Sequence, residues 1–277
     1  MPLAGPMPFD IERIANILRE TAAEEMMPRF AGLDASQIAE KSPGDLVTAI
    51  DLAMERRLSR VLASELPGSV ILGEEAASLD PTRLDLLSGE RPVWVVDPLD
   101  GTGNFAAGLP LFAVIIALIA DGATRAGWIY DPVSGRMATA EEGGGAWMAG
   151  RRLHVAHPSD LRQMNGAIYG RKLRHSDAYR QLWGEGRGRL GQVFNTRCVG
   201  QEYLARLQGG MHFGVYTRLN AWDHAAGCLL HREAGGHVAR FDGTPYRPGA
   251  LQPGILLAPD RELWQVLHAA LIVPAAP

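Results

Sequence analysis

The segment Asp97–Thr102 contains residue types that could bind a metal ion beside a phosphate group. Its two aspartates stand three residues apart, directly after the apolar run Val93–Val96. Hard cations such as Mg²⁺ prefer carboxylate oxygens, and the backbone N–H groups of Gly101 and Thr102 can bind phosphate where the next element begins. The segment therefore favours adjoining metal and phosphate sites, although a lone Asp-x-x-Asp pair is equally expected in a turn or helix cap.

Three further acidic features lie at the ends of predicted strands or at the starts of predicted helices. Asp51 comes shortly after Val47-Thr48, Glu74-Glu75 follow the short strand expected over Ser69–Leu72, and Asp223 opens a predicted helix. Separately, Asp51 and Asp223 could be helix-start charges and the glutamates could be solvated. Taken together with the paired aspartates, they supply enough carboxylates for more than one divalent ion.

The apolar patterns predict the elements that position these residues. Continuous β-branched residues over Val93–Val96 indicate a strand buried on both faces and ending at Asp97. Three further runs predict a strand meander, at Leu111–Ala120, Arg125–Tyr130 and Met137–Ala140. Helical spacing predicts helices over Asp10–Phe30, from Thr48 to Pro67, over Gly200–Gln208, over His224–Ala234 and over Asp260–Leu271. A change of pattern places a domain boundary near residue 150, dividing the chain into residues 1–150 and 151–277.

Composition excludes several functional classes. The 277 residues are 47% hydrophobic and 21% charged, which is typical of a globular protein with a sizeable core. A net charge of −4 without a long basic run argues against a nucleic-acid partner. Two cysteines indicate reduced thiols, and the longest apolar stretch, Leu109–Ala120, is too short to span a bilayer. Because the start also lacks a basic segment of the secretory type, we expect a cytoplasmic protein without a membrane partner.

The acidic segments resemble the signature motifs of the inositol monophosphatase family, in the same order and with similar spacing. The resemblance covers nearly the whole chain, through Lys41–Asp51, Gly73–Glu75, Trp94–Phe105, Gly143–Val155 and Trp222–Gly236. It implies the layered αβαβα sandwich of the inositol monophosphatase and fructose-1,6-bisphosphatase type. It also implies a homodimer, more than one Mg²⁺ ion per site, and a small phosphorylated metabolite as substrate.

The resemblance assigns roles to particular residues. The implied metal ligands are Glu74, Asp97, the carbonyl of Leu99, Asp100 and Asp223. The implied catalytic residues are Thr102, hydrogen-bonded to Asp51, and Glu74, which together activate water. The implied phosphate and substrate contacts are the amides of Gly101 and Thr102, the charge of Lys41, and Gly200, Gln201, Glu202 and Tyr216.

Three departures from the family pattern leave the substrate open. Gly103 stands where the family often has a second threonine, and Tyr216 stands where inositol monophosphatases carry a glutamate that contacts a sugar hydroxyl. Gln201 and Glu202 replace smaller residues. We therefore expect Mg²⁺-dependent hydrolysis of inositol monophosphate or a related polyol or sugar phosphate. The alternatives are histidinol phosphate, a 3′-phosphoadenosine nucleotide, fructose bisphosphate, or a non-catalytic regulatory or binding role.

Overall fold

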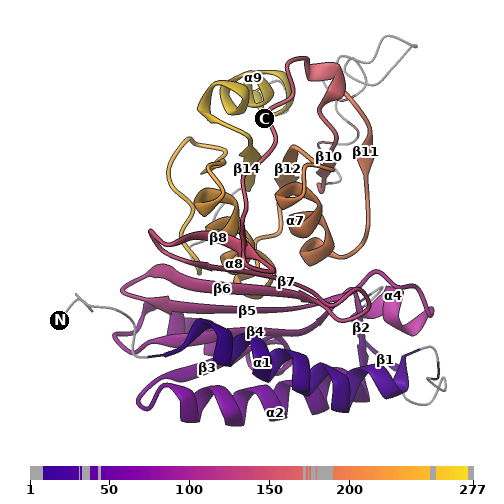
Figure 1. The fold of residues 1–277 in the computed structure, drawn as a ribbon, viewed down its shortest axis with the longest axis vertical. Helices are drawn as coiled ribbons and strands as arrows, with labels where there is room; N and C mark the ends of the chain where they lie inside the picture. Colours follow the sequence, from indigo (N-terminus) through magenta and orange to yellow (C-terminus); the bar gives the residue numbers. More distant parts are fainter. Residues whose placement is uncertain are drawn as a thin grey trace.

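The protein folds into alternating layers of helix and sheet (Figure 1). The computed structural model describes residues 9–30, 32, 38–42, 45–170, 173, 175, 179, 190–249 and 254–273, and only the backbone of Ile38, Lys41, Ser42, Asp45 and Leu46. Two helices, a seven-stranded sheet, two more helices, a five-stranded sheet and a last helix follow one another from bottom to top of the view. This is the αβαβα layering expected from the sequence.

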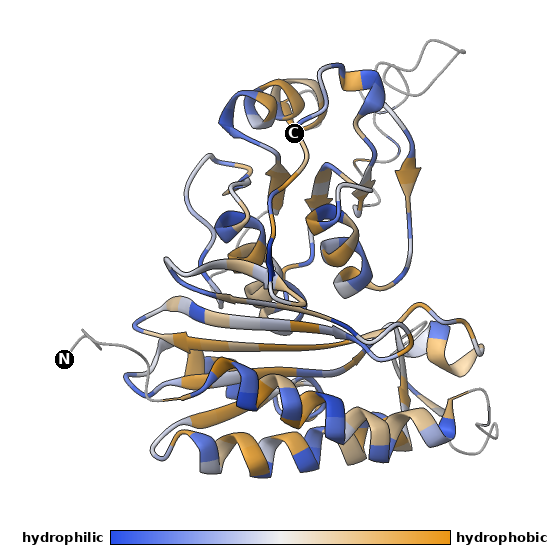
Figure 2. Ribbon diagram, viewed as in Figure 1, coloured by the Kyte–Doolittle hydropathy of each residue, from blue (hydrophilic) through white to orange (hydrophobic). Residues whose placement is uncertain are grey.

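The seven-stranded sheet is the largest element and runs in the order β3-β4-β5-β6-β7-β8-β9. Only β3 and β4 pair in parallel, and every later neighbour is antiparallel. Its strands are β3 (Val70–Gly73), β4 (Val93–Asp100), β5 (Ala113–Ala120), β6 (Ala123–Asp131), β7 (Arg136–Glu141), β8 (Gly145–Met148) and β9 (Arg151–Arg152). Figure 2 shows apolar residues along the central strands, and the predicted meander is confirmed.

Two amphipathic helices cover one face of this sheet. Helix α1 (Ile11–Thr21) is capped by Asp10, whose carboxylate accepts hydrogen bonds from two backbone N–H groups. Helix α2 (Ala49–Glu65) begins at Thr48 with a capping box completed by Asp51. A two-stranded hairpin, β1 (Ile38–Ser42) and β2 (Asp45–Thr48), leads into α2.

The other face of the sheet packs against α7 (Val199–Leu207) and α8 (Ala221–Glu233). Helix α8 lies so close to β6 that a Cβ atom at Gly127 would come within 2.9 Å of the Cα of Ala226, so glycine is required there. The two helices are shared with the second sheet through one continuous apolar core.

The five-stranded sheet has the order β11-β10-β12-β14-β13 and carries α9 (Arg261–Leu271) on its far side. Its strands are β10 (Gly166–Ile168), β11 (Val193–Phe194), β12 (Phe213–Tyr216), β13 (His237–Arg240) and β14 (Ile255–Ala258). The first sheet ends at Arg152 and the second begins at Gly166. Division of the chain into two domains at residue 150 stays a prediction.

Short helices complete the structure. Helices α3 (Glu74–Leu79) and α4 (Thr102–Ala106) directly follow β3 and β4, and three-residue to eight-residue 3₁₀ segments occur at Met27–Arg29, Pro81–Ser88 and Leu161–Gln163. A π-helical turn, Ala22–Met26, extends α1. In the described part of the chain, no helix combines the length and apolar character needed to cross a membrane.

Candidate active site

A cavity of about 650 Å³ is lined by residues from two parts of the chain, between Glu74 and Gly103 and between Tyr169 and His224. All five predicted metal ligands line it, and so do the two residues predicted to bind phosphate through their amides. These residues are Glu74, Asp97, Leu99, Asp100, Gly101, Thr102 and Asp223. They come from the starts of α3, α4 and α8 and from the end of β4. The fold thus brings together residues that are up to 149 positions apart in the chain.

The end of β4 aims its two aspartates into the cavity. The pairing with β5 shifts register between Asp97 and Asp100, so the strand is irregular there. Leu99 donates its backbone N–H to Asp97 across 3.1 Å. Gly101 then turns the chain with φ of +88°, and a Cβ atom there would meet the carbonyl oxygen of Leu111 at 2.8 Å. Glycine is needed at 101 for both reasons.

Helix α7 holds Asp100 from the other half of the molecule. The N–H of Gly200 donates to Asp100 Oδ2 across 2.5 Å, and Cys198 Sγ lies 3.1 Å from the same oxygen. A Cβ atom at Gly200 would come within 2.7 Å of Ala113 Cβ, so a larger residue would move the helix. Gly200 therefore serves the site by orienting a carboxylate. Cys198 was not anticipated, since an isolated cysteine carries no sequence signal.

The two carboxylate oxygens of Asp51 bond to different groups. One oxygen accepts hydrogen bonds from the N–H and hydroxyl of Thr48, which caps α2, and the other lies 3.0 Å from the hydroxyl of Thr102. The hydrogen bond between Thr102 and Asp51 that the resemblance implies is thus present, with the Leu99 carbonyl as a second acceptor at 2.9 Å. Helix capping and a role in the site are compatible here.

Several carboxylates in and beside the cavity are buried and therefore poorly hydrated. Burial raises the pKa of Asp97 well above its ordinary value, and the charges of Glu74, Asp100 and Asp223 raise it further. Burial and the same neighbours also raise the pKa of Asp223. For Asp100, burial outweighs the hydrogen bonds from α7 and raises the pKa to about 6. Burial likewise raises the pKa of Asp51 to about 6.

This donor set suits a hard divalent cation in kind. Every donor is an oxygen, and a cation placed among these acids would offset the repulsion that raises their pKa values. The donors do not form one compact group. Among the described residues, no three His, Cys, Asp or Glu side chains are placed so that they could hold a metal ion together. The structure therefore supports the chemistry of the predicted ligands without showing a preassembled coordination shell.

Tyr216 and Glu202 form one buried hydrogen-bonded unit behind the cavity wall. The Tyr216 hydroxyl donates to Glu202 across 2.6 Å and accepts from the buried Arg206 across 2.9 Å. Tyr216 lines the cavity, but its hydroxyl is hydrogen-bonded inside the protein. Glu202 is completely buried and does not line the cavity. Of these two predicted substrate contacts, only Tyr216 is a cavity residue.

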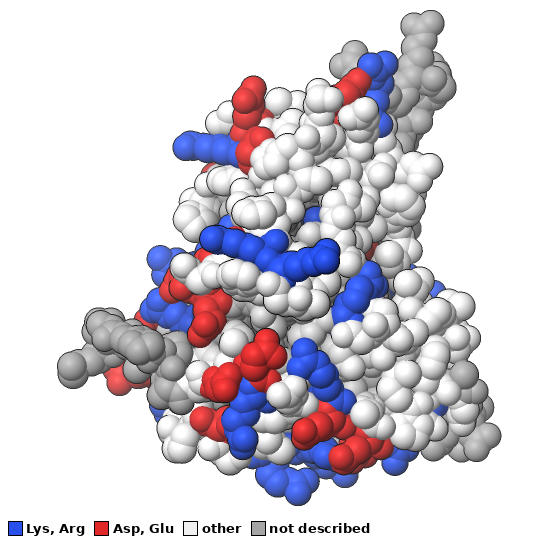
Figure 3. Space-filling model, viewed as in Figure 1, with Lys and Arg blue, Asp and Glu red and all other residues white. Residues whose placement is uncertain are grey.

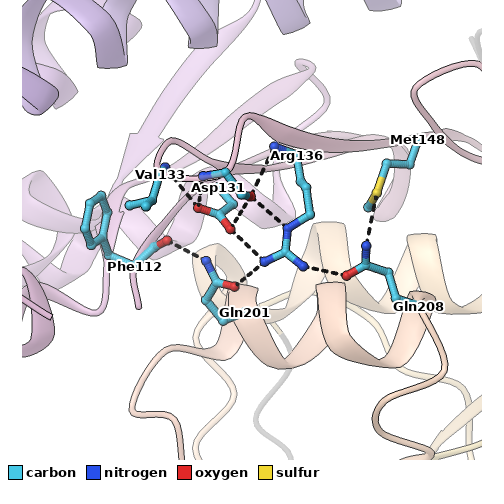
Figure 4. Close-up of polar contacts among 8 residues, drawn as sticks. Phe112, Asp131, Val133, Arg136, Met148, Gln201 and Gln208 are labelled. Atoms are coloured by element: carbon cyan, nitrogen blue, oxygen red, sulfur yellow. Dashed lines mark hydrogen bonds and ion pairs between the residues drawn. The ribbon is translucent and has the colours of Figure 1, made fainter. Parts of the chain in front are cut away.

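Gln201 likewise points away from the cavity, toward the seven-stranded sheet (Figure 4). Its amide donates to the carbonyl of Phe112 across 2.9 Å and accepts from Arg136 across 3.2 Å. Arg136 also binds Asp131 and Gln208, so it ties the β6–β7 turn to α7. The structure thus places Gln201 in the support of α7. The predicted role of Lys41 depends on a side chain outside the described residues.

Several cavity residues were not singled out from the sequence. They come mainly from the C-terminal half and include Tyr169, Asn195, Arg197, Thr217, Arg218, Asn220 and His224. His224 lies in the Trp222–Gly236 segment that carries the resemblance, and Asn220 lies close to Asp223 in the sequence, but the other five have no such signal. Asn220 holds Asp223 through a 3.1 Å hydrogen bond, and burial lowers the pKa of His224 to about 3, keeping it neutral.

Comparison with known proteins agrees with this geometry. The family model described as "Inositol monophosphatase family" matches residues 10–275. The chain is 37% identical to an inositol-1-monophosphatase from Mesorhizobium japonicum, covering 80% of this chain and 82% of that protein. It is 34% identical to the Nus factor SuhB of Pseudomonas aeruginosa, covering 81% and 83%.

The fold is also similar to a solved structure. The extragenic suppressor protein suhB from Bartonella henselae superposes with a TM-score of 0.75 and 27% identity, covering 94% of this chain and 99% of that one. The match extends over both sheets and therefore over both sides of the cavity. The chain belongs to the inositol monophosphatase family of phosphoric monoester hydrolases.

Proposed function

We propose that the protein hydrolyses a small phosphomonoester with the help of Mg²⁺ ions bound by Glu74, Asp97, the Leu99 carbonyl, Asp100 and Asp223. One observation carries the proposal: buried carboxylates with raised pKa values share a cavity with the turn at Gly101-Thr102. Several carboxylates that share one buried cavity favour a multiply charged cation, and that cation favours an anionic substrate.

The chain's own residues have separate tasks in this proposal. The amides of Gly101 and Thr102 bind phosphate oxygens. When the Thr102 hydroxyl donates to Asp51, its oxygen is available to accept a proton from the attacking water, and Glu74 assists from α3. Bound Mg²⁺ would lower the pKa of water and neutralise phosphate charge. Gly200 and Asn220 keep two carboxylates in position.

The substrate that we propose is a polyol or sugar phosphate such as inositol monophosphate. This is supported by the name of the Mesorhizobium japonicum relative and by a cavity large enough for a monosaccharide-sized ligand. Histidinol phosphate, a 3′-phosphoadenosine nucleotide and fructose bisphosphate remain alternatives, since no carboxylate stands at Tyr216. A cytoplasmic location and a homodimer belong to the same proposal, and they rest on composition and resemblance.

A second candidate is a non-catalytic regulatory role, favoured by relatives named Nus factor SuhB. Two observations weigh against it. The proposed metal ligands are all present in the cavity. Over the lower half of the face drawn in Figure 3, the described basic and acidic side chains are interspersed and are not gathered into one basic surface for nucleic acid.

Phosphate release tests the proposal directly. A panel of inositol, sugar, histidinol and nucleotide monophosphates, with fructose bisphosphate, is assayed with Mg²⁺ and with chelator. We expect Mg²⁺-dependent release by the wild type and by Asp242→Asn, an exposed-turn control, and its loss in Asp100→Asn. If no panel member is hydrolysed, calorimetric titration with Mg²⁺ decides between an untested substrate and a site that does not bind metal.

A further inference from the structure

Arg197 has an unusual backbone conformation at the edge of the cavity. Its φ of +54° lies in the left-handed region, which only three described non-glycine residues adopt. This region is strained for a residue with a side chain, so non-glycine residues adopt it mainly where the surrounding structure holds the backbone there. Arg197 follows Asn195-Thr196 and precedes Cys198, three residues before Gly200 of α7. An observed strain of this kind at a cavity calls for a functional explanation.

Hydrogen bonds hold this conformation from several sides. The N–H of Arg197 donates to Asn195 Oδ1 and to the Tyr169 hydroxyl across 3.1 and 3.2 Å. The preceding residue, Thr196, donates its N–H and hydroxyl to the buried Glu202 and accepts from Asn104 across 2.8 Å. Glu202, predicted as a substrate contact, thus fixes the loop that carries Arg197.

The held loop brings the Arg197 guanidinium to the start of α4. Its Nη2 atom lies 3.5 Å from the position that a Cβ atom would take at Gly103. Gly103 directly follows Gly101-Thr102, whose amides we assign to phosphate. The missing side chain at 103, where the family often has threonine, leaves room for the guanidinium beside this turn. Both Arg197 and Gly103 line the cavity.

The guanidinium has hydrogen-bonding capacity that the described residues do not use. Arginine offers five N–H donors. Within residues 9–273 as described, no carboxylate forms an ion pair with Arg197, and no acceptor binds its guanidinium. By contrast, Arg136 and Arg125 each bind two or more side chains. Among the described residues, the Arg197 guanidinium therefore keeps its donors available at the edge of a cavity whose lining includes Glu74, Asp97, Asp100 and Asp223.

We propose that Arg197 is a substrate-binding residue whose guanidinium donates hydrogen bonds to the phosphate oxygens of the monoester, next to the amides of Gly101 and Thr102. The inference rests on the proposed function for its ligand. Guanidinium and phosphate geometries match in a bidentate arrangement. Tyr169, Asn104 and Glu202 are then positioning residues, because they act through the loop. Because Gly103 has no side chain, the guanidinium has space to lie beside the Gly101-Thr102 turn.

Calorimetric binding of inorganic phosphate in the presence of Mg²⁺ tests this assignment without requiring turnover. We expect the phosphate Kd to rise roughly ten- to a hundredfold in Arg197→Gln, because a charge-assisted hydrogen bond is lost. Arg197→Lys retains the charge and should lose less. Arg162→Gln, which removes an exposed arginine outside the cavity, should bind like the wild type. Melting temperatures show whether each variant is folded.

A second substitution tests the geometry independently. Gly103→Val places methyl groups in the space of the guanidinium and should also weaken phosphate binding. If both changes act on one contact, the double variant should bind no more weakly than Arg197→Gln alone. The proposal is overturned if Arg197→Gln binds phosphate within twofold of wild type, or changes only the oligomeric state in sedimentation. Absence of turnover on every monoester would contradict the proposed function alone, since phosphate binding would still report on Arg197.

Discussion

Two buried aspartates on the same sheet have opposite environments. Asp97 near the end of β4 and Asp131 at the end of β6 are 2% and 3% exposed. Burial raises the pKa of Asp131, but hydrogen bonds from Ser134 and Arg136 outweigh it, so the pKa lies below its ordinary value. Around Asp97, burial and three acidic neighbours all raise the pKa.

The difference shows that burial alone does not define the role of a carboxylate. Asp131 has its partners inside the protein and joins the β6–β7 turn to α7 through Arg136 (Figure 4). Asp97 lies among acids, so a proton or a bound cation has to neutralise its charge. Partner chemistry therefore separates a structural aspartate from one suited to bind a cation, even at equal exposure.

The largest expected effect comes from neutralising each aspartate in turn. Asp97→Asn should reduce phosphate release by roughly a thousandfold or more, since it removes a proposed metal ligand worth several kcal/mol. With chelator present, the same change should raise the melting temperature, because it relieves repulsion. Asp131→Asn should instead lower the free energy of unfolding by about 1–3 kcal/mol, through lost hydrogen bonds.

Addition of Mg²⁺ provides the control for this pair. Because a ligand that binds the folded state stabilises it, Mg²⁺ should raise the melting temperature of the wild type and of Asp131→Asn. The increase should be reduced or absent in Asp97→Asn. Equal stabilisation of both variants by Mg²⁺ would contradict the contrast between the two aspartates.

An intermediate effect is expected at the arginine that compensates Asp131. Arg136→Met removes the bonds to Asp131, Gln201 and Gln208, and should lower the free energy of unfolding by about 1–3 kcal/mol in urea titration. Arg125→Met is the matched control, because Arg125 also bridges two acids on this sheet, Asp121 and Glu142, at the surface. Its loss should cost at most about 1 kcal/mol. Similar losses for both would show that the Arg136 contacts are no stronger than surface pairs.

The smallest effect is the pH dependence that Asp131 contributes. Because its pKa is lowered by folding, its stabilisation is present above the unfolded pKa of about 4 and disappears as pH falls through the folded value. The difference in unfolding free energy between wild type and Asp131→Asn should therefore be constant near neutral pH and shrink in acid. A difference that grows below pH 4 would reverse the assigned sign.

Local signals in the sequence predicted most of the fold. The helical spacing that begins at Asp10 and at Thr48 and the β-branched run at Val93–Val96 correspond to α1, α2 and β4. Helix α8 begins at Ala221, three residues before the start predicted at His224. Asn220 is the cap, and Asp223 lies in the first turn, where it is free to face the cavity. Capping preferences alone do not distinguish these positions.

The proposed metal ligands were predictable from the sequence, because these carboxylates follow strands or lie at helix starts. The predicted substrate contacts were less predictable. Gln201 and Glu202 follow Gly200 directly, yet Gln201 faces the β6–β7 turn and Glu202 faces β12. The direction of each side chain depends on partners far away in the sequence, such as Arg136 and Tyr216. Arg197 was missed for the same reason, since its left-handed backbone is held by tertiary hydrogen bonds.

The close approach of Gly127 to Ala226 links the integrity of the cavity to that of the core. The helix whose first turn presents Asp223 is the same helix that lies against β6 with no space for a side chain at the contact. A separation of the two halves would displace a carboxylate of the site and expose the shared apolar layer together. Loss of the site and global unfolding should therefore form a single cooperative transition on heating, with no warm, folded but inactive state between them.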